Sequence, residues 1–174
     1  MVQDKLQELI RSYCSDDDAP AFRRFYRHES QRLWRYLVAR GATEAQAYDL
    51  VSESFIRFLK TVCKNPIAPS AYLFRIAQNL LIDLQRSGPS REVSIEINEL
   101  ESKQDVGGTF IEARDVFVAI NKLTRDEQNI VLLRYWLGMT YKELAEIIGR
   151  PEGTLRRQGA SALRRLKELL PEYE

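Results

Sequence analysis

Residues that build catalytic and metal sites are scarce in this sequence. Its 174 residues include two cysteines and one histidine. Cys14 and Cys63 have no partner at the spacing of a metal or redox motif, so we expect both to be reduced thiols. His28, in FYRHESQ, has no nucleophile or metal ligand beside it and is interpreted as a solvated helical histidine. There is also no Walker loop or dinucleotide glycine motif, so the sequence predicts neither an enzyme nor a cofactor or metal.

Long apolar runs and a signal sequence are also missing. No apolar run reaches about 18 residues, the length that spans a bilayer. The N-terminal sequence MVQDKLQELIRSY is polar and lacks the apolar core of a signal peptide. We therefore expect a cytoplasmic protein without membrane insertion.

An excess of one charge is absent, but the charges are unevenly distributed. The net charge of +1 excludes a uniformly basic protein. The stretch from Glu92 to Asp115 is acidic, whereas the last quarter of the chain is rich in cations. Because nucleic-acid affinity depends on local cation density, this asymmetry favours a basic surface near the C-terminus. Its cations are Arg150, Arg156, Arg157, Arg164, Arg165 and Lys167.

Helical periodicity is present over nearly the whole chain. Apolar residues recur at helical spacing in three stripes, of which Tyr72–Leu84 is the most regular. Three threonines, each followed by Gln or Glu three residues later, fit the capping box that opens a helix. These patterns predict an all-α protein. The three pairs are Thr43 with Gln46, Thr124 with Glu127, and Thr140 with Glu143.

The periodicity stops between Arg86 and Thr109, in a stretch that contains SGPS, an acidic run and two adjacent glycines. Because such a long linker is unusual inside one compact domain, we predict two small helical domains joined by a flexible linker. Val93, Ile95 and Ile97 alternate as in a short strand, but no second strand is apparent to pair with it. The predicted ranges are 1–17 for an extra N-terminal helix, 18–87 for the first domain, 88–111 for the linker and 112–174 for the second domain.

The segment Thr140–Leu166 predicts a helix-turn-helix, preceded by a helix over Arg125–Leu137. Thr140 caps a short helix, Gly149 suits the tight turn after it, and Pro151 suits the start of the next helix. The second helix of such a unit enters the major groove, where arginine binds guanine bidentately and also grips phosphates. The candidate DNA-contacting residues are Thr154, Arg156, Arg157, Gln158, Ser161 and Arg164.

Gly159 departs from this pattern. Glycine costs about 1 kcal/mol relative to alanine in a helix interior. It lies four residues after Leu155, on the inward face, where a large apolar residue is expected. Two interpretations are open: the glycine lets the recognition helix approach its neighbour closely, or it leaves a looser core that becomes ordered when a partner binds.

Three segments together resemble the extracytoplasmic-function group of bacterial sigma-70 factors. AYDLVSESFIRFLK, Ala47–Lys60, resembles the part of the family that docks on the coiled coil of the β′ subunit of RNA polymerase. SAYLFRIAQNLLIDLQRS, Ser70–Ser87, resembles the part that melts the promoter and reads the −10 element. LTRDEQNIVLLRYWLGMTYKELAEIIGRPEGTLRRQGASALRRL resembles the −35-reading domain. The resemblance implies a sigma-2-like domain followed by a sigma-4-like helix-turn-helix domain, with a variable linker between them.

The resemblance assigns Ala47–Lys60 to core polymerase. Asp49 and Glu53 are one helical turn apart, so we expect a carboxylate pair on an outward face, bordered by Leu50 and Phe55. Such a mixed acidic and apolar patch suits docking on a basic coiled coil.

The resemblance assigns Ser70–Ser87 to the −10 element, where bases must be held out of the stack. The loop Asn65–Pro69 is a candidate base pocket. Tyr72 and Phe74 are interpreted as packing residues, and Asp83 as a salt-bridge partner within the domain. The candidate −10 contacts are Arg75, Gln78, Asn79 and Arg86.

The recognition helix differs from the family pattern GTVKSRLHRAR. Gly159 replaces a leucine, and Ala160 and Ser161 replace a polar and a basic residue. We still expect −35 contacts through Arg156 and Arg157, whereas fewer phosphate contacts are expected further along the helix.

The function that the resemblance implies is that of an alternative sigma factor. Its implied partners are core RNA polymerase, through the β′ and β subunits, promoter DNA and an anti-sigma factor. Two other interpretations stay open at this point. One is an autonomous helix-turn-helix transcription regulator. The other is a sigma-like protein that acts mainly as a protein-interaction module, which a recognition helix weakened at Gly159 would favour.

Overall fold

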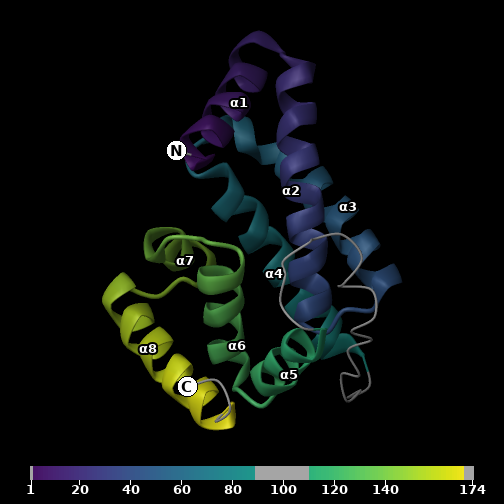
Figure 1. Ribbon diagram of the computed structural model, residues 1–174. Coiled ribbons are helices and arrows are strands. Elements are labelled where there is room, and N and C mark those ends of the chain that lie inside the picture. Colours follow the sequence, from purple (N-terminus) through teal and green to yellow (C-terminus); the bar gives the residue numbers. More distant parts are fainter. Residues whose placement is uncertain (1, 89–109, 171–174) are drawn as a thin grey trace. The chain divides into compact units, whose positions relative to one another are not determined.

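The computed structural model describes residues 2–88 and 110–170, with side chains from residue 115 onward in the second stretch. Every regular element in these stretches is helical, which confirms the predicted all-α fold (Figure 1). None of the described helices is long and apolar enough to cross a membrane. The elements are α1 (Val2–Asp16), α2 (Ala19–Ala39), α3 (Glu44–Thr61), the 3-10 turn η1 (Val62–Lys64), α4 (Pro69–Ser87), α5 (Phe110–Asn121), α6 (Arg125–Val131), the π-helical turn η3 (Leu132–Trp136), α7 (Tyr141–Ile148) and α8 (Glu152–Leu169).

The helices fall into two compact units. The first contains α1 to α4, and the second contains α5, α6, η3, α8 and most of α7. The residues between the units, including the strand suggested by Val93, Ile95 and Ile97, lie outside the described residues. The domain boundaries at 17, 87 and 111 therefore stay predictions.

The helix starts follow the local sequence. All three capping boxes are present, with the threonine side chain accepting from the third backbone N–H and the Gln or Glu side chain accepting from the threonine N–H. Pro69 opens α4, where a missing N–H costs no helical hydrogen bond. The sequence signals for helix initiation are thus confirmed at Thr43, Thr124 and Thr140.

The core of the first unit is built from aromatic residues on α2, α3 and α4. The rings of Phe25 and Phe58 stack with centroids 5.3 Å apart, and Phe55 lies edge-on to Phe25. On α4, Phe74 packs against Tyr36, and both side chains are fully buried. Aromatic burial of this extent supplies much of the packing energy of a small helical unit.

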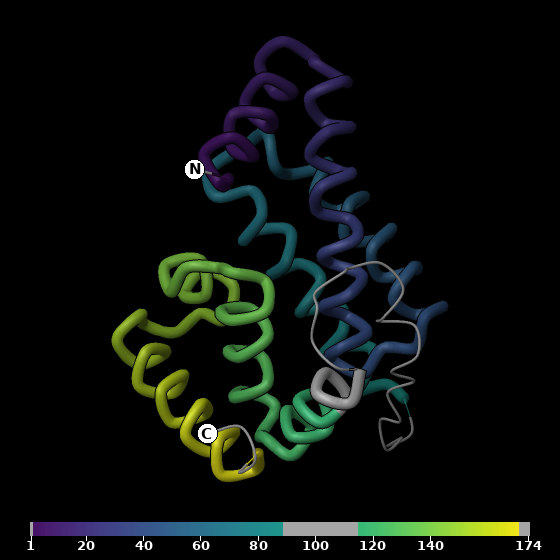
Figure 2. Tube along the Cα trace, in the orientation of Figure 1, coloured from purple at the N-terminus to yellow at the C-terminus, as the bar shows by residue number. Residues whose placement is uncertain are grey.

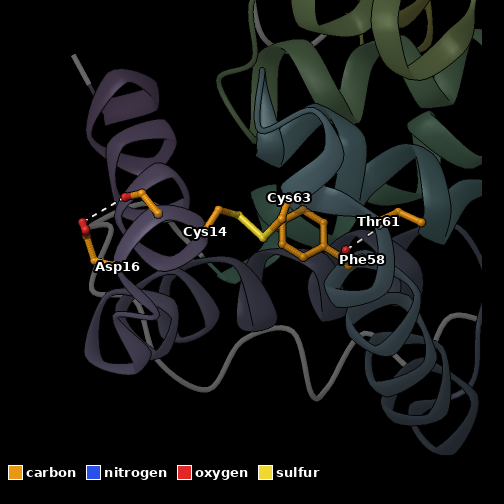
Figure 3. The surroundings of a disulfide bond; sticks show 6 residues. Cys14, Asp16, Phe58, Thr61 and Cys63 are labelled. Carbon is orange, nitrogen blue, oxygen red and sulfur yellow. Dashed lines mark hydrogen bonds between the residues drawn. A yellow bond between two sulfur atoms is a disulfide. The ribbon is translucent and has the colours of Figure 1, made fainter.

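The two cysteines form a disulfide, so the prediction of two reduced thiols is wrong. Cys14 at the end of α1 is bonded to Cys63 in η1, with their Cα atoms 5.3 Å apart (Figure 3). Figure 2 shows α1 beside α2, and α1 also contacts η1 and α4. Metal and redox motifs have short cysteine spacings, whereas this pair is separated by 49 positions and meets through packing of α1 on the bundle.

The second unit is organised around a helix that changes type. The predicted helix over Arg125–Leu137 is α-helical to Val131 and continues as the π-helical turn η3. Leu133, Leu144 and Leu155 are fully buried and join η3, α7 and α8 in one core. A π-helical turn rotates the side chains that follow it, and such turns often occur at functional sites.

Candidate nucleic-acid and polymerase interfaces

The outer face of α3 carries carboxylates beside apolar side chains. Asp49 is exposed, and Glu53 is partly exposed and forms an ion pair with Arg57 at 2.7 Å. On the same helix, Tyr48 is 58% exposed and Ile56 is 49% exposed. The predicted mixed acidic and apolar surface is therefore present, but its apolar members differ from the expected ones.

Leu50 and Phe55 do not border this surface, and that part of the prediction is wrong. Both are buried, and the ring of Phe55 lies 4.7 Å from that of Tyr26 on α2. Their positions belong to the inward stripe that also contains Phe58, so helical periodicity alone indicates burial. Tyr48 and Ile56, which sequence reasoning missed, follow from the same periodicity as residues on the opposite side.

The outer face of α4 carries the four predicted −10 residues. Arg75, Asn79 and Arg86 are exposed, and Gln78 is partly buried beside them. Because residues four and seven apart on a helix share a face, Arg75, Asn79 and Arg86 form one stripe. The helix thus presents two cations and an amide to the same side.

The other predicted features of α4 have mixed outcomes. Phe74 is fully buried, and the hydroxyl of Tyr72 hydrogen-bonds that of Thr61, so the packing interpretation of both residues is confirmed. Asp83 is exposed and has no salt bridge among the described residues, contrary to expectation.

In the loop before the helix, Ile67 is 63% exposed. Ala68 adopts the left-handed region with φ 46°, a conformation that is unfavourable for alanine.

The helix-turn-helix is formed by α7, a tight turn and α8. Gly149 has φ 74°, which glycine adopts without strain, and it directs the chain into α8. Along α8, Arg156, Arg157 and Arg164 are exposed, whereas Thr154, Gln158 and Ser161 are partly exposed. All six predicted −35 candidates are therefore accessible on one helix.

The arginines of this region divide into two groups. Arg165 donates to both carboxylate oxygens of Glu127 at 2.9 Å, and Arg150 pairs with Asp126 at 2.7 Å. These two side chains connect α8 and the turn before it to α6, so they are structural. Within the described part of the chain, Arg157 and Arg164 form no ion pair, which leaves their guanidinium groups available to a partner.

Glu127 combines two structural roles. Burial alone would raise the pKa of Glu127, but hydrogen bonds from the backbone N–H and hydroxyl of Thr124 and from Arg165 outweigh burial. The pKa of Glu127 is therefore held below its ordinary value. The same carboxylate caps α6 and anchors α8.

Gly159 is buried, and the space beside it is filled. A Cβ atom at this position would lie 2.7 Å from the hydroxyl oxygen of Tyr141 and 3.3 Å from Cγ2 of Ile130. Of the two interpretations left open by the sequence, the close approach is the one that the structure supports. The glycine admits a tyrosine side chain rather than leaving a loose core.

Together these surfaces define a class of protein. In the first unit, α3 has an acidic and apolar outer face and α4 has a basic one. The helix-turn-helix follows later in the chain, and its Arg157 and Arg164 form no ion pair among the described residues. This is a two-unit, helical, DNA-binding protein with a second surface suited to a protein partner.

Two family models match the chain, one in each unit. The model of sigma-70 region 2 matches residues 25–89, and that of sigma-70 region 4 matches residues 114–166. The chain is 32% identical to the ECF RNA polymerase sigma factor BldN of Streptomyces coelicolor, over 97% of this chain and 67% of that protein. The chain therefore belongs to the extracytoplasmic-function sigma factors of RNA polymerase.

Further relatives and solved structures agree with this assignment. ECF RNA polymerase sigma factor SigL of Mycobacterium tuberculosis is 26% identical over 89% of this chain and 92% of that protein. The sigma factor RpoE of Bartonella quintana, solved with the anti-sigma factor NepR, has a TM-score of 0.68 at 19% identity and covers 88% of this chain and 98% of its own. CnrH, solved with the cytosolic domain of CnrY, has a TM-score of 0.71 at 20% identity, covering 98% and 99%. The two structural likenesses show that the fold is shared.

Proposed function

We propose that this sigma factor divides its work among three surfaces: the outer face of α3 binds core RNA polymerase, α4 acts at the −10 element, and α8 reads the −35 element. The observation that carries the proposal is the pair of family matches, region 2 over the first unit and region 4 over the second. Promoter specificity then comes from binding alone, and the chemistry of RNA synthesis belongs to the core enzyme.

The polymerase-docking surface consists of Tyr48, Asp49, Glu53 and Ile56. Its two carboxylates attract a basic partner and orient the encounter, while its exposed apolar side chains supply area that is buried on docking. Leu50 and Phe55 support this surface from inside the unit by holding α3 against α2.

The −10 surface consists of the stripe on α4 and the loop before it. Arg75 and Arg86 provide cations for the backbone of an unpaired strand, and Asn79 provides an amide for a base edge. The exposed side chain of Ile67, next to the left-handed Ala68, offers an apolar surface for an unstacked base. Strained backbone of this kind concentrates at functional loops.

The −35 surface is the exposed side of α8. Arg156 and Arg157 lie in its first two turns, where a recognition helix meets base edges, and Arg164 lies further along, within reach of phosphates. Gln158 and Ser161 add neutral hydrogen-bonding groups between them.

An anti-sigma factor is the third partner that we infer. RpoE was solved in complex with the anti-sigma factor NepR, and CnrH with the cytosolic domain of CnrY. A protein that covers the α3 and α8 surfaces would keep this chain from the polymerase in the cytoplasm.

The proposal is tested by titrating core RNA polymerase into labelled protein. The double variant Asp49→Ala with Glu53→Ala loses two charges worth up to about 1 kcal/mol each, so we expect about tenfold weaker binding. Glu8→Ala removes an exposed charge on α1 and serves as the matched control with unchanged affinity. Equal affinity of the double variant and the control would show that α3 is not the docking element.

The same material separates a sigma factor from an autonomous regulator. A promoter fragment is expected to shift in a native gel only when core polymerase and this chain are both present. Tight, sequence-specific binding by the chain alone would instead support an autonomous helix-turn-helix regulator.

A further inference from the structure

One aromatic residue of the helix-turn-helix lies against two arginines. The guanidinium carbon of Arg156 is 4.9 Å from the ring centroid of Tyr141, and that of Arg134 is 5.2 Å from the same centroid. Both distances are within the range of favourable cation–π contacts. Tyr141 is the first residue of α7, so it joins the start of the short helix to the recognition helix.

The position of Tyr141 depends on Gly159. The Tyr141 hydroxyl occupies the space that a Cβ atom of residue 159 would need, since the two would be only 2.7 Å apart. Any larger side chain at position 159 displaces the ring from its place beside Arg156. Gly159 therefore leaves space on α8 for the side chain of Tyr141, one helical turn from Arg156, which is predicted to contact a base.

The π-helical turn η3 holds Tyr141 from the other side. The hydroxyl groups of Tyr135 and Tyr141 are 3.1 Å apart, and this hydrogen bond raises the pKa of Tyr135 above its ordinary value. Arg134 donates to the backbone carbonyl of Met139 at 3.0 Å, which anchors its guanidinium beside the ring. Tyr141 is thus fixed at its hydroxyl by Tyr135 and at its ring by Arg134.

We propose that Tyr141 is a positioning residue for Arg156 in −35 recognition, and that Gly159 is the residue that makes room for it. The proposal rests on the proposed role of α8 at the −35 element. Arg156 is restrained by the Tyr141 ring and by Glu152, whose carboxylate is 3.3 Å from the Arg156 guanidinium. A long side chain that is already restrained loses less conformational freedom when it binds a base, so it discriminates between bases more strongly.

Arg157 is the natural comparison. It follows Arg156 directly and is also exposed, but it has no ion pair or aromatic partner among the described residues. A change at Tyr141 is therefore expected to alter the sequence preference contributed by Arg156 and to leave that contributed by Arg157 intact.

The test is transcription by the full chain with core RNA polymerase on a promoter library randomised at the −35 element. Arg156→Ala identifies the base pair that Arg156 reads. Tyr141→Leu is expected to reduce the preference at that same base pair by about 3- to 10-fold, the size of a partly exposed cation–π contact. Tyr141→Phe keeps the ring and is expected to retain the preference within about twofold.

Two more variants separate positioning from stability. Gly159→Ala places a methyl group 2.7 Å from the Tyr141 hydroxyl oxygen and 3.3 Å from Cγ2 of Ile130, so it is expected to displace the Tyr141 ring and to reduce the same preference while the protein stays folded. In the double variant of Tyr141→Leu with Arg156→Ala, the loss is expected to be no greater than in Arg156→Ala alone. Thermal unfolding of each variant provides the folding control.

The outcomes distinguish this inference from the proposed function. If the wild-type holoenzyme shows no preference at −35, the role of α8 is wrong. If it has a preference that Arg156→Ala flattens but Tyr141→Leu leaves unchanged, the inference about Tyr141 is wrong. A uniform loss of transcription across all −35 sequences in Tyr141→Leu, with the base preference kept, also overturns the positioning role.

Discussion

At the scale of single residues, the arginines of α8 show how similar side chains acquire different roles. Arg165 is used inside the second unit, Arg156 lies against Tyr141, and Arg164 is exposed without an ion pair among the described residues. Their spacing in the sequence places them on a helix but does not say which carboxylate or ring each one meets. That information depends on α6 and α7, which reach α8 only through tertiary packing.

The difference between neighbouring arginines leads to a prediction about stability. Arg165→Ala removes a bidentate pair that is half exposed on the arginine side, so we expect the free energy of unfolding to fall by about 1 kcal/mol. Arg164→Ala is the matched control and is expected to leave stability unchanged. The Arg164→Ala variant is expected to reduce the slope of log affinity against log salt concentration for promoter binding by about one, as for a single lost phosphate contact. Urea unfolding and a salt titration of binding measure the two effects. A loss of stability in Arg164→Ala with none in Arg165→Ala would contradict the structural role of Arg165.

The residues of the candidate sites were predictable where periodicity alone decides exposure. Arg75, Asn79 and Arg86 share an exposed face of α4, as their spacing requires. For Leu50 and Phe55, the resemblance to a docking segment predicts an exposed position, whereas helical periodicity correctly indicates burial. The Tyr141–Gly159 contact was not predictable, because it depends on how two helices approach and on the π-helical turn before them.

At the scale of elements, the disulfide has the largest expected effect. It closes a chain segment with a separation of 49 residues between α1 and η1. By the chain-entropy relation, such a cross-link stabilises the folded state by about 4 kcal/mol.

We therefore expect reductant to lower the urea midpoint of the oxidised wild-type protein. The variant with Cys14→Ser and Cys63→Ser already lacks the bond, so reductant is expected to have no effect on it. The exposure of Cys63 allows the reductant to reach the bond. If the wild-type protein and the double variant respond equally to reductant, the bond between α1 and η1 does not contribute to stability.

The start of α6 leads to a pH prediction at the same scale. The folded-state pKa of Glu127 lies below its ordinary value of about 4.5, so the unfolded state takes up a proton first as the pH falls. The stabilisation by this carboxylate is fully present above that value and is lost as the pH falls from about 4.5 through the lower folded-state pKa.

Glu127→Gln tests this assignment, because glutamine keeps the capping hydrogen bond to Thr124 but cannot carry the charge that Arg165 meets. We expect the variant to be less stable at neutral pH and to lose less stability on acidification below about pH 4.5. Unfolding curves over this pH range measure both effects. A variant with the same pH profile as the wild-type protein would show that other carboxylates dominate acid unfolding.

At the scale of the whole molecule, the sequence was sufficient for the fold class and the family. Helical periodicity and three capping boxes predicted the elements, and three separate segments carried the resemblance that the region 2 and region 4 matches confirm. The disulfide could not be predicted, because a pair of distant cysteines has no local signal. The predicted linker falls mostly in residues 89–109, outside the described residues.

The measurement that decides between the proposed function and its alternatives is the mapping of transcript 5′ ends. Purified core RNA polymerase transcribes genomic DNA of the source organism with and without this protein. We predict new start sites that share one upstream element at −10 and another at −35, and that are lost with the Asp49→Ala and Glu53→Ala double variant. Start sites identical to those made by core polymerase alone would contradict the assignment of this protein as a promoter-specific sigma factor.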